Sequence, residues 1–361
     1  MSGTIVASTI NAGASSPLVL QSNSVTGITL DTSQNTTFAG SATFAGTAVM
    51  ASSFRRNRLI NGNMAIDQRN SGASQTITAA AALAYTVDRW YAYCTGANVT
   101  GQQVAGATAG QYRYQFTGAA SVTAIGFAQR IETLNSADLS GTTATLSVDM
   151  SNSLLTTVTW TAYYANTSNT FGTLASPTVT SIATGTFTVT SSIARYSANI
   201  SIPSAAVTGI QILFTVGAQT SGTWVIGNVQ LEPGALATPY EYNPTNDQLA
   251  QCQRYYLRYT SGASNARYAL GRVDTTSTAK SIIPFPVLMR VAPATFTSSL
   301  AATFGIAYAA TTSTCTVDPA YSDSTTLCSR INFTTTATMT VGQGVEIFAA
   351  NAGYLAWSSE L

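Results

Sequence analysis

The chain has 361 residues, a formal net charge of +1 and only 8% charged residues, while 45% of its residues are hydrophobic. This composition excludes an intrinsically disordered chain, and it leaves no overall electric field that would attract nucleic acid. The length suffices for two ordinary hydrophobic cores, and the many Thr, Val and Ile residues favour pleated strands over helices. We therefore expect an all-β protein with two globular domains and an arm, and no nucleic-acid partner.

The first residues, Met1 to Ser8, carry no positive charge. We therefore expect no secretory leader and synthesis in a cytosol, because a leader begins with a basic segment. The most apolar window, Ile77 to Val87, is about half as long as a membrane-spanning helix and is rich in alanine. No membrane insertion is expected.

Residues 1–56 contain short apolar runs that Gly, Ser and Asn separate, which is typical of small strands. The hexapeptide Thr37–Ala42 is repeated with little change as Thr43–Ala48. A short, nearly uncharged repeat cannot bury Phe38 and Phe44 by itself, so other copies of the chain must cover these rings. The pattern predicts an intertwined fibre shaft, with a flexible leader as the alternative.

Residues 57 to about 245 alternate strand-like and turn-like runs, about nine strands in all, as in a β-sandwich. Several runs have period-two alternation, such as Phe187 and Val189, which indicates one buried face per strand. Helices are expected at two places only. They are Ala79–Ala84, from alanine propensity, and Asn246–Tyr256, where apolar residues have helical spacing.

The four cysteines show no C-x-x-C spacing, and the chain has no histidine, which excludes zinc sites of the usual kind. They are Cys94, Cys252, Cys315 and Cys328. Synthesis in a cytosol favours buried free thiols, with a Cys315–Cys328 disulfide across a polar loop as the alternative. We expect neither a metal nor a cofactor.

Four segments resemble, in order and spacing, the signature segments of tailed-bacteriophage tail-fibre and related virion fibre proteins. They are Asn57–Asn70, Tyr85–Trp90, Val229–Glu241 and Cys252–Tyr256. The stretch from Phe285 to Leu361 resembles the small β-domain that often closes such fibres. The first fifty residues resemble fibre shafts in composition and repetition.

The resemblance implies a homotrimeric fibre made in the host cytoplasm and located in the virion. Residues 1–56 would form the virion-attaching arm and shaft, residues 57–245 a carbohydrate-binding-module-like jelly roll, and residues 246–361 a C-terminal β tip. A virion tail or capsid protein would hold residues 1–40, and the distal end would attach the particle to a host cell-surface glycan. The alternative is a capsid-attached head fibre or decoration protein with a mainly structural role.

Within the signature segments, Tyr85–Tyr93 reads as one alternating strand. On this interpretation Val87 and Arg89 face one side, while Asp88 and Trp90 face the other. Trp90 is expected to fill the sandwich core rather than to form a sugar platform. The charged residues of the motifs are expected to form ion pairs that fix strand ends, with a cation bound at Asp67 or Asp88 as the alternative. These residues are Asp67, Arg69, Asp88, Arg89 and Glu232.

Arg55–Arg58 is the one basic cluster, and it lies where the arm meets the first domain. We expect its guanidinium groups to donate hydrogen bonds to carbonyls of neighbouring chains. Contact with a phosphate or an acidic glycan is the alternative interpretation.

Catalysis is not expected, because the 14 acidic residues are scattered and histidine-dependent nucleophiles are excluded. Asp318 and Asp323 are the nearest approach to a carboxylate pair, in a stretch that we expect to be an exposed loop. Aromatic and polar side chains of the C-terminal domain are instead the candidates for receptor binding. The candidates are Tyr308, Asp318, Tyr321 and Asp323. Tyr255, Tyr256 and Tyr259 are expected to be packed under the domain junction.

Overall fold

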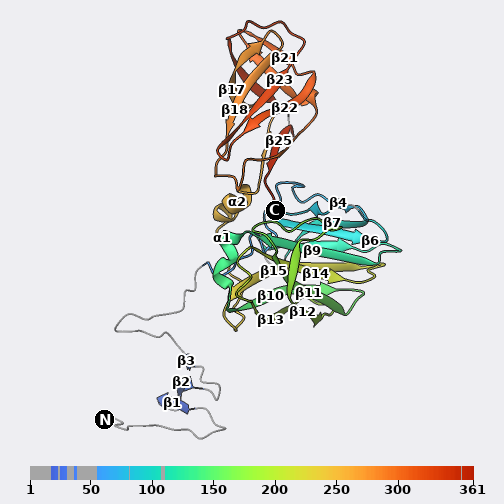
Figure 1. The fold of residues 1–361 in the computed structure, drawn as a ribbon, viewed down its shortest axis with the longest axis vertical. Coiled ribbons are helices and arrows are strands. Elements are labelled where there is room, and N and C mark those ends of the chain that lie inside the picture. The colour runs from blue at the N-terminus through green and yellow to red at the C-terminus, as the bar shows by residue number, and fades with distance from the viewer. Residues whose placement is uncertain are drawn as a thin grey trace. The chain divides into compact units, whose positions relative to one another are not determined.

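The computed structural model describes residues 18–22, 25–30, 36–38, 55–80, 82–106, 110–350 and 352–361. The chain divides into two compact units, Met1–Ser53 and Phe54–Leu361. Strands dominate the described residues of both units (Figure 1). The predicted all-β class is confirmed.

The first unit contains an antiparallel sheet of three strands, in the order β1-β2-β3. They are β1 (Leu18–Ser22), β2 (Val25–Leu30) and β3 (Thr36–Phe38). The backbone of Phe38 pairs with that of Ile28 across β2 and β3. Phe44 lies outside the described residues, so burial of Phe38 and Phe44 in a trimeric shaft stays a prediction.

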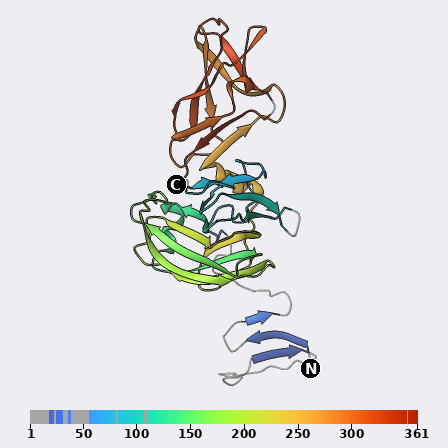
Figure 2. The same ribbon diagram turned by 90° about the vertical axis from the view of Figure 1, so that its right-hand side faces the viewer.

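The N-terminal part of the second unit is a sandwich of two six-stranded sheets, which Figure 2 shows from a second side. One sheet has the order β13-β10-β15-β8-β7-β4, and the other has the order β12-β11-β14-β9-β6-β5. We call the second the β12–β5 sheet. The strands are β4 (Gln75–Ile77), β5 (Ala84–Tyr85), β6 (Trp90–Thr95), β7 (Val99–Ala105), β8 (Tyr112–Thr117), β9 (Ala124–Ile131), β10 (Thr143–Asn152), β11 (Thr157–Ala165), β12 (Val179–Thr188), β13 (Ala194–Ser201), β14 (Ile210–Val216) and β15 (Thr223–Pro233).

Aromatic rings from both sheets fill the space between them. Trp90 of β6 stacks on Phe127 of β9 with ring centroids 4.9 Å apart, and Phe116 of β8 stacks on Trp224 of β15 at 5.1 Å. All four side chains are fully buried. The prediction that Trp90 belongs to the core is therefore confirmed, and burial of such large apolar surfaces is what stabilises the two-layer arrangement.

The prediction of one strand from Tyr85 to Tyr93 is wrong. The chain turns between β5 and β6, where Arg89 has a left-handed φ of 72° and the amide of Thr86 donates to the carbonyl of Trp90 at 2.8 Å. Asp88 and Arg89 lie in this turn and not in a strand, so the predicted alternation of faces does not apply to them, and both are buried. This hairpin turn contains neither Gly nor Pro, and for that reason the alternating pattern concealed it.

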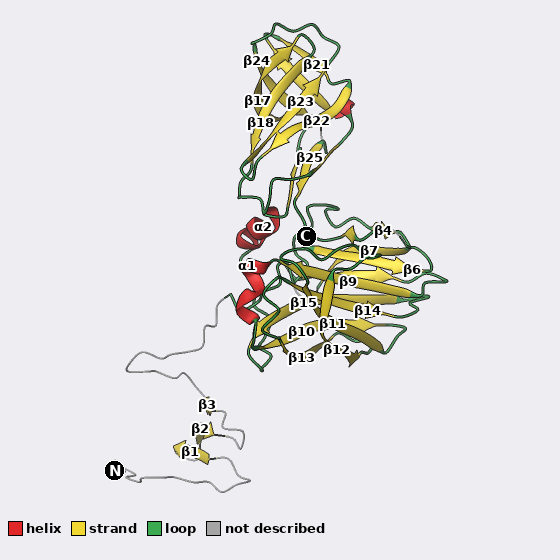
Figure 3. Ribbon diagram, viewed as in Figure 1, coloured by secondary structure: helices red, strands yellow, loops and turns green. Residues whose placement is uncertain are grey.

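Helices are short and few among the described residues (Figure 3). The predicted helix near residue 246 is confirmed as α2 (Thr245–Gln253), whereas α1 (Thr133–Ser136) with the 3-10 turn Ala137–Leu139 was not foreseen. The described residues of Ala79–Ala84 are not helical, because neighbouring strands take their amides: Ala80 donates to the carbonyl of Cys94 at 3.1 Å. No helix in the described ranges is long and apolar enough to cross a membrane.

The C-terminal part has a second core and two further sheets, one in the order β16-β25-β19 and one in the order β21-β20-β24-β17-β18-β23-β22. Trp357 lies in this core, with Phe285 and Phe296 at centroid distances of 5.4 and 5.5 Å. The strands are β16 (Tyr256–Thr260), β17 (Ala266–Thr275), β18 (Thr278–Pro284), β19 (Thr295–Ser298), β20 (Phe304–Tyr308), β21 (Thr311–Thr314), β22 (Val317–Ser324), β23 (Cys328–Thr334), β24 (Gly344–Ala349) and β25 (Tyr354–Ser358).

All four cysteines are free thiols, as predicted, so the alternative disulfide between Cys315 and Cys328 is not formed. Cys94, Cys252 and Cys315 are buried, whereas Cys328 is partly exposed. Burial raises the pKa of the Cys315 thiol to about 12, which keeps it protonated and unreactive.

Ion pairs form at three of the five motif residues for which they were predicted. Glu232 pairs with Arg56 at 3.1 Å, and both Arg69 and Arg89 pair with Glu360, the first at 3.0 Å. Glu360 and Arg89 are almost completely buried. The C-terminal segment therefore returns to the sandwich and supplies the acidic partner of its motif arginines.

The prediction is wrong for Asp67 and Asp88, which make no ion pair among the described residues. Asp67 accepts the backbone amides of Asn70 at 3.0 Å and Gly72 at 2.8 Å, so it closes a turn. Asp88 accepts a hydrogen bond from Gln68 Nε2 at 2.6 Å. Burial raises the pKa of Asp88 to about 7. The described residues contain no group of three or more His, Cys, Asp and Glu able to hold a metal ion.

The basic cluster before the sandwich binds its own chain. Arg56 donates to the carbonyl of Pro233 at 3.0 Å, and Arg58 donates to the carbonyl of Arg55 and pairs with Asp138, both at 2.5 Å. Arg56 and Arg58 thus donate to carbonyls of their own chain, and the predicted bonding to carbonyls of neighbouring chains stays a prediction. The cluster fixes the start of the sandwich.

Candidate functional site

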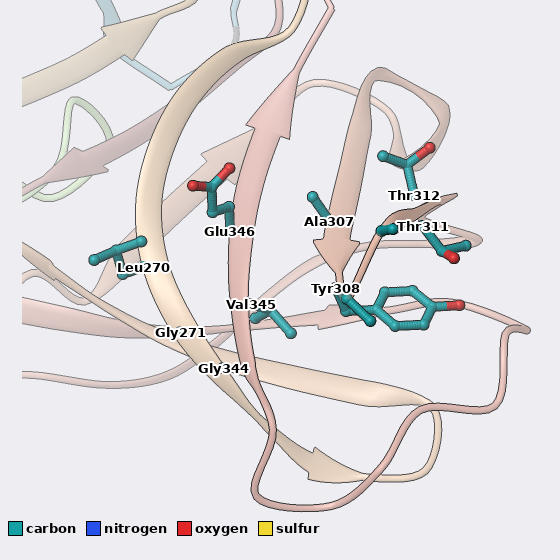
Figure 4. A pocket seen from close by; sticks show the side chains of 11 residues that line it. Leu270, Gly271, Ala307, Tyr308, Thr311, Thr312, Gly344, Val345 and Glu346 are labelled. Atoms are coloured by element: carbon teal, nitrogen blue, oxygen red, sulfur yellow. The ribbon is translucent and has the colours of Figure 1, made fainter.

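The predicted receptor residues lie on the seven-stranded sheet of the C-terminal part. Tyr308, at the end of β20, lines an open groove of about 560 Å³ together with Leu270 and Glu346 (Figure 4). The Tyr308 ring points away from these two residues in this view. Tyr308 is half-buried, and the remaining lining of the groove consists largely of Gly, Ala and Thr.

The other three candidates do not join Tyr308 in that groove. Asp318 accepts the amide of Ala301 at 2.5 Å, and Asp323 pairs with Arg330 at 2.6 Å, while Tyr321 is 41% exposed. The stretch is the edge strand β22 and not the predicted loop, since an edge strand tolerates a proline that lacks an amide donor. The structure therefore supports no single site made of these four residues, and their role in binding stays untested.

A different arrangement appears on the outer face of the β12–β5 sheet, the face that points away from the sandwich core. Phe127, Phe214 and Trp160 point inward from the central strands, so the residues between them point outward. We call this outer surface the tyrosine face. Its residues are Tyr91 and Tyr93 of β6, Gly126, Ala128 and Arg130 of β9, Gln211, Leu213 and Thr215 of β14, and Thr159, Thr161 and Tyr163 of β11.

Strand register arranges these residues in three rows across the sheet. The first row places Thr159 opposite Thr215, Thr215 opposite Gly126, and Gly126 opposite Tyr93. The second row runs from Thr161 through Leu213 and Ala128 to Tyr91, and the third from Tyr163 through Gln211 to Arg130. Tyrosines thus flank the face on both sides of its centre.

Small residues form the floor between the tyrosines. A Cβ added to Gly126 would lie 2.1 Å from the Tyr93 ring, so this ring lies directly over the Gly126 backbone. Ala128 in the next row is fully buried. Only a residue without a side chain permits such a close approach of the ring. The half-buried Tyr93 ring therefore lies against the sheet, in the same row as Thr215 and Thr159.

One end of the tyrosine face opens into a hollow of about 600 Å³. Thr157, Thr159 and Thr215 line it together with Gly217. The hydroxyl groups of these threonines are small donors and acceptors that a polar ligand can reach. The hollow and the first row of the face share Thr159 and Thr215, so they form one continuous surface.

Arg130 occupies the other end of the face. Its Nε donates to Gln211 Oε1 at 3.2 Å, and its two other nitrogens donate to the carbonyls of Leu361 at 2.7 Å and Gly172 at 3.0 Å. The guanidinium carbon lies 5.1 Å from the centroid of the Tyr91 ring. Arg130 is 6% exposed and is the one charged side chain in the three rows.

The hydroxyls of Tyr91 and Tyr93 stay neutral at physiological pH. Burial raises the pKa of Tyr91 to about 12, although the nearby Arg130 opposes this shift. Burial, followed by the neighbouring Tyr163, also raises the pKa of Tyr93. Neutral phenols both donate and accept hydrogen bonds. Tyr91 is fully buried, so the half-buried Tyr93 and Tyr163 are the tyrosines that the face offers, together with threonine hydroxyls and no acidic side chain. This set can bind a polar ligand, but it lacks the paired acids that glycoside cleavage requires.

The sequence interpretation missed the tyrosine face. The sequence places Tyr91 and Tyr93 in one predicted strand, but strand patterns do not reveal which strands are neighbours. The available signal was the phase of Tyr91 and Tyr93, which alternate with the core residues Trp90, Ala92 and Cys94. Their grouping depends on the order of β11, β14, β9 and β6 in the sheet.

No protein-family model matches the chain, and no curated protein matches its sequence. Among solved structures, the chain is similar to a family 4 carbohydrate-binding module at 19% identity, with 48% of this chain and 98% of that chain covered and a TM-score of 0.31. It is also similar to the enzymatically active domain of tailspike protein 4 of bacteriophage CBA120 at 16% identity. The match covers 50% of this chain and 22% of that chain, with a TM-score of 0.32.

A third similar structure is the C-terminal family 22 carbohydrate-binding module of Clostridium thermocellum Xyn10B. Its identity is 13%, with 42% of this chain and 89% of that chain covered and a TM-score of 0.29. The structures that resemble this chain thus include carbohydrate-binding modules and a phage tailspike domain. At these TM-scores the likenesses establish neither a shared fold nor a shared function.

Proposed function

We propose that the chain binds a glycan on the tyrosine face of its sandwich. The observation that supports this is the placement of Tyr93 and Tyr163 on either side of a floor that contains Gly126, Ala128 and Leu213, beside threonine hydroxyls. Sugars stack their apolar faces on aromatic rings, while hydroxyls and amides hydrogen-bond to their edges. The face contains both elements on a rigid sheet.

The proposal includes a place for this binding in a virus particle. The chain is proposed to be a trimeric virion fibre that attaches the particle to a host cell-surface glycan, with residues 1–40 held by a tail or capsid protein. The resemblance of the signature segments and the repeat in residues 37–48 support this placement. Three identical faces on one fibre would convert weak glycan contacts into strong attachment through avidity.

Binding rather than cleavage is proposed for the same face. Arg130 is its one charged side chain, so no acid and base flank a bound sugar. Asp318 and Asp323 in the C-terminal part are each engaged, one by a backbone amide and one by Arg330.

The test is adsorption of the purified full chain to host cells and to an array of neutral glycans. We expect Tyr93→Ala and Tyr163→Ala each to reduce binding about tenfold or more, which corresponds to about 1.4 kcal/mol. Tyr308→Ala and Tyr321→Ala are the matched controls in the C-terminal part, and we expect them to leave binding unchanged.

Two outcomes would contradict the proposal. If the Tyr308 and Tyr321 variants lose binding while the other two keep it, the contact surface lies in the C-terminal part. If the unmodified chain binds no glycan and no host cell but is still incorporated into particles, it is a structural appendage.

A further inference from the structure

The geometry points to a glycan-binding face that is blocked at one end, so we infer that it takes the terminal residues of a neutral glycan and not an internal segment of a long chain. This inference rests on the proposed function and specifies its ligand. Three observations support it: the segments that contact Arg130, the bonds that anchor those segments, and the open hollow at the opposite end of the face.

The blocked end is built from three separate parts of the chain. Arg130 holds the carbonyl of Gly172 in the loop between β11 and β12, and the carbonyl of Leu361 in the C-terminal segment. The buried Phe171 ring lies beside the same guanidinium, 5.3 Å from its carbon. The hydroxyl of Tyr85 on the edge strand β5 donates to the Leu361 carbonyl as well, at 3.0 Å.

The C-terminal segment is a fixed wall because its neighbouring residues are anchored. The Glu360 carboxylate is 5% exposed and pairs with Arg69 and Arg89, as described above. Arg290 donates to the carbonyls of Ser359 at 2.7 Å and Glu360 at 2.9 Å. A ligand that displaced Leu361 would therefore have to disrupt buried ion pairs, which is costly because the partners would remain buried without a counter-charge.

The opposite end of the face has no such wall among the described residues. There the first row continues into the hollow of about 600 Å³, and both Thr157 and Gly217 at its rim are exposed. Rows on one side of a sheet are two residues apart, so roughly 13–14 Å along the strands separates the first row from the third row, which contains Arg130. That length accommodates a few sugar residues between the wall and the open hollow.

Neutral glycans fit the blocked end better than acidic ones. Each of the three nitrogens of Arg130 already donates a hydrogen bond to an oxygen of the protein, and the side chain is buried. A sugar carboxylate therefore has little access to the guanidinium group of Arg130, a residue that is 6% exposed. Arg130 is therefore a positioning residue that fastens the wall, and the tyrosines and threonines contact the sugar.

The probe is a graded series of neutral oligosaccharides, from disaccharides to octasaccharides, with malto-, cello-, manno- and galacto-type linkages. The parent polysaccharides are tested before and after partial endo-cleavage. We expect affinity per molecule to reach its maximum at a short length and then to stay constant. Polysaccharide binding should rise several-fold after cleavage, because each cut creates a new end.

Two results together would overturn the inference but not the proposed function. The affinity would keep rising up to the octasaccharide, and the uncut polysaccharide would bind as strongly, per unit mass, as its fragments. Absence of binding to every probe would overturn the proposed function, and this inference with it.

A second arm tests the wall directly. Arg130→Gln removes the donors to Leu361 and Gly172. We expect the oligosaccharide length that this variant binds most tightly to increase, and to increase less in Arg130→Lys. Melting temperatures show whether each variant is folded. Tyr85→Phe, which loses one hydrogen bond to the wall, replaces Arg130→Gln if that variant does not fold. An unchanged length dependence in the folded variants would overturn the assignment of Arg130 and Leu361 as the wall.

Discussion

Arg89 and Glu360 form a buried ion pair that connects the β5–β6 turn of the sandwich to the C-terminal segment. The guanidinium carbon of Arg89 also lies 3.5 Å from the centroid of the Tyr255 ring, directly after α2. Arg69 has the same arrangement. It pairs with Glu360 at 3.0 Å, and its guanidinium carbon lies 3.6 Å from the centroid of the Tyr256 ring. Tyr255 and Tyr256 are buried at the junction, as predicted, while the half-buried Tyr259 packs against Trp357 in the C-terminal core.

The first prediction concerns this junction. Glu360→Gln leaves Arg69 and Arg89 buried without their counter-charge, and we expect a loss of roughly 3–5 kcal/mol in the free energy of unfolding. Glu346→Gln is the control, because its pair with Arg267 is half-exposed and is worth about 1 kcal/mol or less. Denaturant unfolding measures both. Equal losses would show that the buried pair has no special role.

The second prediction concerns pH. Burial raises the pKa of Asp88 from 3.8 to about 7, so the folded state binds this proton more tightly than the unfolded state does. The resulting stabilisation is complete below the unfolded value of 3.8, and it is lost as pH rises through 7, by up to about 1.4 kcal/mol per pH unit. We expect Asp88→Asn to melt higher than the unmodified chain at pH 8, but not at pH 4.

Asp274→Asn is the control for this experiment. Hydrogen bonding to Lys280 lowers the pKa of Asp274, so its stabilisation is present above 3.8 and is lost as pH falls. The two substitutions therefore act in opposite directions. A melting temperature of Asp88→Asn that follows the unmodified chain at every pH would refute the role of Asp88.

The third prediction concerns the floor of the tyrosine face. Gly126→Ala places a methyl group where the Tyr93 ring lies, so the ring must move away from the sheet. We expect glycan binding to fall about tenfold or more, or about 1.4 kcal/mol. Gly262→Ala in the C-terminal part is the matched control, because nothing lies within 4 Å of its added Cβ. Unchanged binding by Gly126→Ala would exclude Tyr93 from the contact.

The fourth prediction concerns salt. The tyrosine face has one charged side chain, and its nitrogens are already engaged, so Coulomb attraction contributes little to glycan binding. Charges are screened within about 8–10 Å at physiological ionic strength. We expect the affinity for a bound neutral oligosaccharide to change by less than about twofold between low and high salt. A steep decline in titration calorimetry would point to an ionic contact elsewhere.

The fifth prediction concerns the arm. Phe38→Ser with Phe44→Ser removes two rings that we expect to be buried between copies, each worth roughly 1.5–3 kcal/mol per chain. Light scattering should give a trimer for the unmodified chain and a smaller mass for the double variant. Leu134→Ser, at a position that is 82% exposed in the second unit, should remain trimeric. A monomeric mass for the unmodified chain would refute the prediction.

The sequence by itself determined the features that arise from local preference. Abundant β-branched residues and period-two alternation indicated an all-β chain, and the large apolar ring of Trp90 was sufficient to place it in the core. The helical spacing of Leu249 and Cys252 likewise identified α2. Each inference needs only the residue itself and its near neighbours in the chain, because propensity and burial periodicity are local properties.

The tertiary structure alone decided which residues meet. The partner of Arg89 lies 271 positions away, and no pattern near either residue indicates that Glu360 approaches it. Tyr93 and Tyr163 share a face only because β9 and β14 lie between their strands. The turn at Arg89 is recognised from the left-handed φ of that residue. Strand order and chain reversal are set by the packing of the whole core, so the candidate site could not be read from the chain.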